Sequence, residues 1–165
     1  MTIKMEAALP QPSTDTIRRV EAELGLTLPA SYVAALAFLN GARPEINFFK
    51  DDGKTYEVAN FLPVVELPYH KRLMDDFNPS SRVPIAGDSC GNSFCMGTDG
   101  DECGIIYFAD HEIPGDDAFH RIASSLEDFL ERLQVDDDPS RWPEPAPGGE
   151  VWIDPAFKEF LDKYR

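Results

Sequence analysis

Three cysteines and three histidines are the side chains of this 165-residue chain best suited to nucleophilic chemistry. A cysteine nucleophile needs a nearby base and a lowered thiol pKa. Cys90 lies in the glycine-containing loop 88–92 and is the best-placed candidate. The available bases are His70, His111 and His120. No protease or hydrolase motif surrounds Cys90, and the G-x-S-x-G motif is missing, so a turn residue is the favoured interpretation of this cysteine.

The sequence contains no complete motif for binding a metal ion or a phosphate group. A structural zinc site favours paired ligands such as C-x-x-C, and the spacing of Cys90, Cys95 and Cys103 contains no such pair. The phosphate-binding pattern G-x-x-x-x-G-K-[ST] is absent, and no G-x-G-x-x-G follows a strand. We therefore predict no metal, no cofactor and no catalytic residue.

The stretch 99–110 partly imitates a calcium-binding EF-hand loop. Its first, third and sixth positions are Asp99, Asp101 and Gly104. The fifth position is Cys103, a poor ligand for a hard cation, and the twelfth is Asp110 instead of a bidentate glutamate. The flanking residues have the pattern of strands, whereas the EF-hand loop joins helices. A polar hairpin turn is therefore favoured.

Carboxylates are concentrated in the second part of the chain. The sequence has 30 acidic and 15 basic residues, a net charge of -15. Residues 1–98 carry 12 acidic and 9 basic residues, and residues 99–165 carry 18 and 6. The segment 99–117 has no lysine or arginine, and its acidic residues are our predicted partner-binding residues: Asp99, Asp101, Glu102, Asp110, Glu112, Asp116 and Asp117.

This charge distribution restricts the classes of partner. Nucleic acids and anionic lipids bind through lysine and arginine, so the charge argues against both. An acidic surface favours a basic protein partner and speeds its encounter. Two other interpretations of the segment are a surface that only keeps the protein soluble and a metal-binding loop at residues 110–117.

Two helices joined by a short link are predicted at the start of the domain. In residues 13–24, apolar side chains recur at helical spacing, with Ser13 or Thr14 as cap and Gly25 as the stop. Pro29 suits the first turn of a second helix, which Asn40-Gly41 ends because both residues tolerate the left-handed conformation.

Short strands are predicted from residue 44 onward. Two of them flank Asp52-Gly53, the run 62–67 is extended, and residues 69–77 contain a helical turn. Further strands are predicted in RVPIAG, which Gly87 stops, in SFCMGT and in GIIYFAD. The unbroken apolar run 105–109 predicts a central strand covered on both faces.

The last part of the chain contains one clear helix and an appendage. Residues 122–133 are predicted as a helix with Ser124 and Glu127 as a capping box, ending near Gln134. We predict a domain at 1–135, a Pro- and Gly-rich acidic linker at 136–150, and a helix at 151–165 that docks on the domain or on a partner.

The order of these elements predicts an α+β fold, in which an N-terminal helix pair and a late helix pack on a mostly antiparallel central sheet. Parallel βαβ alternation is absent. No run approaches the ~20 apolar residues of a membrane helix, and no signal peptide is visible, so a cytoplasmic location is predicted.

Three groups of residues together resemble the SUKH superfamily, which includes the fungal Smi/Knr cell-wall regulators and many bacterial proteins. The first group is Glu21, Leu24, Gly25, Leu28, Pro29, Tyr32, Asn40 and Gly41. The second is Ile85, Ala86, Asp88, Gly91 and Asn92, and the third is Tyr107, Phe108, Asp110, His111 and Glu112. The resemblance covers about residues 14–134.

The resemblance implies an α+β fold and, for bacterial members, an immunity protein. Such a protein is not an enzyme: it binds and neutralises a polymorphic toxin, often a nuclease. The matched residues also have structural explanations, since Pro29 starts a helix and Asp88 and Asn92 can bond the loop backbone. Two alternatives stay open, a regulatory or scaffold protein that binds an endogenous partner and a small hydrolase or metal-dependent enzyme. The sequence does not predict the oligomeric state.

Overall fold

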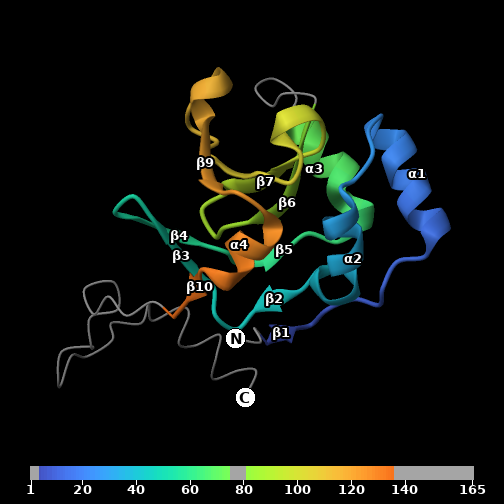
Figure 1. The fold of residues 1–165 in the computed structure, drawn as a ribbon, viewed down its shortest axis with the longest axis horizontal. Coiled ribbons are helices and arrows are strands. Elements are labelled where there is room, and N and C mark those ends of the chain that lie inside the picture. The colour runs from blue at the N-terminus through green and yellow to red at the C-terminus, as the bar shows by residue number, and fades with distance from the viewer. Residues whose placement is uncertain (1–3, 75–80, 136–165) are drawn as a thin grey trace, which may run out of the picture.

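The computed structural model describes residues 4–74 and 81–135 of the chain (Figure 1). The helices are α1 (Thr14–Leu24), α2 (Ala30–Leu39), α3 (Leu67–Leu73) and α4 (Leu126–Glu131). Short 3-10 helices are η1 (Val64–Glu66), η2 (Gly100–Glu102) and η3 (Gly115–Ala118). None of the helices in these two ranges is long and apolar enough to cross a membrane. The predicted linker 136–150 and terminal helix 151–165 lie outside the described residues.

The strands of the described residues form three antiparallel sheets. The largest has the order β5 (Asn60–Phe61), β6 (Arg82–Gly87), β7 (Ser93–Gly97), β8 (Ile106–Ala109) and β9 (Phe119–Ala123). The second has the order β10 (Leu133–Gln134), β3 (Phe48–Asp51) and β4 (Lys54–Glu57), and a third pairs β1 (Met5–Glu6) with β2 (Arg43–Pro44). Helices combined with antiparallel sheets confirm the predicted α+β class.

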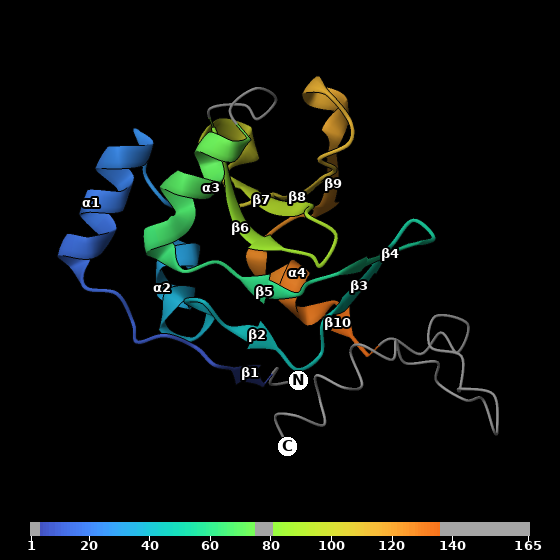
Figure 2. The ribbon, with the colours of Figure 1, turned by 180° about the vertical axis from the view of Figure 1, so that it is seen from behind.

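One face of the five-stranded sheet builds the main core with side chains from the helices. The cluster joins Tyr32 and Leu36 of α2 and Phe129 of α4 to sheet residues such as Phe94. The rings of Phe94 and Phe129 lie 5.4 Å apart. The opposite face carries a smaller cluster of Met74, Cys95 and Ala109 with Phe119 packed against it. Figure 2 shows α1, α2 and α3 gathered on one side, while the β3–β4 hairpin projects on the other.

The predicted helix pair is confirmed, and polar side chains fix its geometry. The Ser13 hydroxyl caps α1 by accepting from the Thr16 N–H at 3.1 Å, and Gly25 ends the helix at φ 68°. The Leu28 N–H donates to the Glu21 carboxylate at 2.9 Å and so fastens the link between the two helices. Glu21 therefore has a structural role.

The end of α2 differs in one detail from the prediction. Gly41 adopts a left-handed conformation at φ 67°, but Asn40 has φ -59°. The Asn40 side chain instead forms two hydrogen bonds. Its amide oxygen accepts from the Val64 N–H at 2.9 Å, and its amide nitrogen donates to the Pro10 carbonyl at 2.8 Å. This buried amide therefore links three separate segments.

The prediction of an extended run at residues 62–67 is wrong. Residues 64–66 form η1, and α3 begins at Leu67. The bond from the Val64 N–H to Asn40 orients the first turn, and Pro68 is tolerated there because early helical N–H groups lack intrahelical partners. The predicted helical turn in 69–77 is confirmed through Leu73, and residues 75–77 lie outside the described residues.

The prediction of a helix at residues 122–133 is wrong at both ends. Ile122 and Ala123 belong to β9, and Leu133 and Gln134 form β10. Pairing of β9 with β8 buries Ile122 and Ala123, so these residues form a strand although their local spacing also fits a helix. The cap is also shifted by one residue, because Ser125 Oγ accepts from the Asp128 N–H at 3.1 Å.

The apolar run 105–109 contains β8, an interior strand of the sheet that pairs with a neighbour on each side, so the predicted central strand is confirmed. All four residues of β8 are buried. The strand is fourth in the five-stranded sheet, between β7 and β9. β8 is apolar throughout because both of its faces are covered: Ile106 and Phe108 belong to the main core, and Ala109 belongs to the smaller cluster on the opposite face.

Candidate functional site

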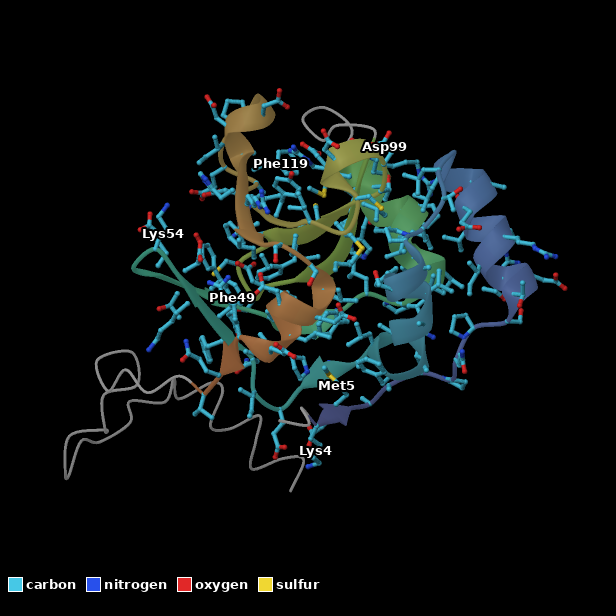
Figure 3. The ribbon with its side chains drawn as sticks, viewed as in Figure 1. Lys4, Met5, Phe49, Lys54, Asp99 and Phe119 are labelled. Atoms are coloured by element: carbon cyan, nitrogen blue, oxygen red, sulfur yellow. The ribbon has the colours of Figure 1, made fainter. Side chains whose placement is uncertain are left out.

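The structure divides the seven predicted partner-binding residues into two groups at opposite ends of β8. Asp99, Asp101 and Glu102 lie in or beside η2, before the strand, as the predicted polar turn. The others follow the strand in the loop that contains η3: Asp110, Glu112, Asp116 and Asp117. A four-residue strand separates the two groups by roughly 13 Å. The segments η2 and η3 both lie at the upper edge of the molecule in Figure 1, and Figure 3 labels Asp99 there.

Glu102 is engaged within the fold. Both of its carboxylate oxygens accept from the Arg82 guanidinium, at 2.7 and 3.0 Å. Arg82 is 12% exposed, and its guanidinium lies 4.0 Å from the centre of the Tyr107 ring. Hydrogen bonds from Arg82 hold the pKa of Glu102 below its usual value. This ion pair fastens η2 to β6, so Glu102 has a structural role in addition to its charge.

The backbone of η2 also lies directly against β7. A Cβ atom at Gly97 would lie 2.0 Å from the Glu102 carbonyl oxygen. Only glycine permits this approach, because any side chain at residue 97 would displace the turn. The other carboxylates of this group, Asp99 and Asp101, are exposed, and neither forms an ion pair within the described part of the chain.

Asp110 shapes the second acidic loop. Its Oδ1 accepts from the Glu112 N–H at 2.9 Å, and its own N–H donates to the Ala118 carbonyl at 2.9 Å. The loop therefore holds Glu112, Asp116 and Asp117 outward, and all three are exposed. Within residues 4–74 and 81–135, none of these three carboxylates forms an ion pair, so their charge is available to a partner.

A polar network joins this loop to the turn between β6 and β7. Asp88 Oδ1 accepts from the N–H groups of Cys90 and Asn92, at 2.9 and 2.7 Å. The Asn92 amide oxygen lies 2.8 Å from His111 Nδ1 and accepts from the His111 N–H at 3.2 Å. These contacts support the structural interpretation of Asp88 and Asn92 that the sequence suggested.

The cysteines and histidines do not assemble into a nucleophilic pair among the described residues. Cys90 is exposed, and no hydrogen bond joins its thiol to an imidazole there. Cys95 is buried, which raises the pKa of its thiol to about 12. Cys103 is exposed and belongs to the turn after η2. No group of three or more His, Cys, Asp or Glu side chains in the described residues is arranged to hold a metal ion.

A groove that was not predicted from the sequence lies between the β3–β4 hairpin and the β6–β7 turn. Its volume is about 830 Å³, and Tyr56, Glu57, Ser89, Asn92 and Phe108 are among its lining residues. The rings of Tyr56 and Phe108 lie 4.6 Å apart, and the Ser89 hydroxyl donates to the Glu57 carboxylate across the two segments. The hairpin and the turn were each predicted, but no local pattern indicates that they face each other.

The comparisons with known proteins define the class. Residues 11–132 match the SMI1 / KNR4 family (SUKH-1), so the chain belongs to this family. A search of curated proteins finds no match. The family is generally a non-catalytic immunity-type domain of toxin systems, and membership implies a protein partner. The match covers both acidic loops and the groove, and it ends just after α4.

Proposed function

We propose that this protein is an immunity protein that binds and neutralises a basic toxin domain, such as a nuclease, through its two acidic loops. The observation that carries the proposal is family membership over residues 11–132 together with exposed carboxylates that have no ion pair in the described residues. These carboxylates are Asp99, Asp101, Glu112, Asp116 and Asp117.

The charge has a direct physical consequence for such a partner. A nuclease binds phosphate, so its active cleft carries lysine and arginine side chains. An acidic protein is attracted to that cleft before contact and can cover it after contact. A delivered toxin acts inside the recipient cell, and we therefore propose that the protein acts in the cytoplasm.

Co-expression with each candidate toxin domain encoded near this gene tests the proposal. We expect cells to survive toxin expression and the two proteins to purify together. A test variant has Asp99, Asp101, Asp116 and Asp117 changed to lysine and should rescue growth less well than the unchanged chain at equal expression. If the unchanged chain neither rescues growth nor purifies with any neighbouring toxin, the proposed function is wrong.

A further inference from the structure

Strand β4 has one unpaired edge in the described part of the chain. In the sheet order β10–β3–β4, only β3 pairs with β4. Asp52 and Gly53 have φ values of 45° and 74°, the conformation of a two-residue type I′ hairpin loop. In such a hairpin, the residues next to the loop, Asp51 and Lys54, form a hydrogen-bonded pair.

The register then determines which backbone groups point away from β3. Hydrogen-bonded pairs alternate along an antiparallel ladder, so Phe49 and Tyr56 form the next one. The bond from the Val58 N–H to the Asn47 carbonyl, at 2.7 Å, continues the same alternation. The N–H and C=O groups of Thr55 and Glu57 therefore face outward, and neither residue has a backbone partner within residues 4–74 and 81–135.

The groove runs along this edge. Thr55 and Glu57 line it from β4, residues 88–90 line it from the opposite turn, and Tyr56 and Phe108 provide aromatic surface. Its volume of about 830 Å³ falls within the range of ligand sites in proteins. A segment in extended conformation could bond to Thr55 and Glu57 and place alternate side chains against the two rings.

The charges in and beside the groove favour a basic occupant. Among the residues that the structure describes, two carboxylates line it, from Glu57 and Asp88, and the one lining cation is Lys54 at the tip of the hairpin (Figure 3). An arginine or lysine side chain can contact the face of an aromatic ring and form an ion pair with a carboxylate at the same time. The second acidic loop adjoins the groove, because Asn92, which lines the groove, lies 2.8 Å from His111 Nδ1.

We propose that the free edge of β4 is a docking site for an extended, basic segment of the protein partner, which adds a strand to the β10–β3–β4 sheet. The inference rests on the proposed function for the identity of the partner. The segment would exchange backbone hydrogen bonds with Thr55 and Glu57. A basic side chain would enter the groove and pair with the Glu57 carboxylate, one oxygen of which accepts from the Ser89 hydroxyl.

The probe is a capped heptapeptide of alternating arginine and valine, with a glutamate-for-arginine peptide as control, added to the full chain. Amide hydrogen exchange and nitrogen-15 NMR report on each residue of β4. We expect the arginine peptide to slow exchange of the Thr55 and Glu57 amides at least about tenfold, because they gain hydrogen-bond partners. The glutamate peptide should leave both amides unchanged.

A pair of variants tests the backbone contact. Thr55→Pro removes one outward N–H, which an edge strand tolerates, and Thr55→Val keeps it. We expect Thr55→Pro to weaken peptide binding about tenfold and Thr55→Val less than about twofold. Since the exchange experiment uses the unchanged chain, it remains decisive even where Thr55→Pro disturbs the hairpin.

Two results would overturn the inference. One is an arginine peptide that leaves the Thr55 and Glu57 amides as they are in the free protein. The other is slow exchange of both amides before any peptide is added, which would show that another part of this chain or a second copy covers the edge. Growth rescue by the toxin co-expression experiment is scored separately, so failure of the docking site and failure of the immunity function give different results.

Discussion

The two acidic loops at the ends of β8 have similar composition but use their carboxylates differently. The loop with η2 is held against the sheet by the Glu102–Arg82 ion pair and by the close approach of its backbone to Gly97. The loop with η3 holds its exposed carboxylates in solvent and is joined to the groove through His111 and Asn92. Acidic composition alone therefore does not identify a binding residue, because part of the charge stabilises the fold.

The largest expected difference between the loops comes from two glycines. Gly97→Ala would place a Cβ against the Glu102 carbonyl, and we expect it to lower the free energy of unfolding by about 3 kcal/mol. Gly115 in η3 has φ 69° and no atom near its Cβ position, so Gly115→Ala should cost about 1–2 kcal/mol from backbone strain alone. Urea denaturation measures both. Equal losses would show that η2 is not held more tightly than η3.

A smaller difference is expected from two glutamates. Glu102→Gln removes the charge from a bidentate pair with Arg82, and we expect a loss of about 1.5 kcal/mol in the free energy of unfolding. Glu112→Gln removes a carboxylate without an ion pair in the described residues, and its effect should stay within about 0.5 kcal/mol. If the two variants are equally stable, Glu102 is not a structural residue.

The same pair predicts a dependence on pH. The pKa of Glu102 is lowered in the folded protein from its ordinary 4.5, so the unfolded state takes up the proton first as the pH falls. Ionised Glu102 therefore stabilises the fold above pH 4.5, and this contribution is lost as the pH falls through the lowered pKa. The stability difference between wild type and Glu102→Gln should shrink from neutral to strongly acidic pH, as denaturation across that range would show. A stability difference that does not change with pH would contradict a lowered pKa of Glu102 in the folded protein.

The smallest effect is expected from the segment that follows both loops. We predict that the helix at residues 151–165 docks on the domain or on a partner. If it docks on a partner, deletion of residues 136–165 should change the free energy of unfolding by less than about 0.5 kcal/mol. Thermal and urea denaturation of the shortened chain measure the change. A loss of several kcal/mol would show that the last segment packs on the domain and contributes to its core.

Features set by neighbouring residues could be predicted from the sequence. Ser13 and Gly25 bound α1, and Asp52-Gly53 forms the hairpin loop, because capping and turn conformations depend on a few adjacent residues. Strand β9 was missed because its strand character comes from pairing with β8, whereas Ile122, Leu126 and Phe129 also fit a helical spacing.

The candidate site was predictable only in part. A local count of charges located the acidic segment 99–117, but the engagement of Glu102 depends on Arg82, twenty residues away on another strand. The groove depends on the packing of residues 54–57 against residues 88–92, which no spacing in the sequence reveals. The features that could not be predicted are therefore those that depend on contacts between segments far apart in the chain.

The association rate with the proposed toxin partner tests the central claim most directly. Stopped-flow measurements at several salt concentrations would compare wild type with a variant in which four exposed carboxylates are changed to lysine: Asp99, Asp101, Asp116 and Asp117. A control variant reverses four acidic residues outside the loops: Glu6, Asp15, Glu45 and Glu131. We predict that the loop variant associates at least about tenfold more slowly at low salt and loses most of its salt dependence, whereas the control changes less. Association of the loop variant at the wild-type rate would contradict the account.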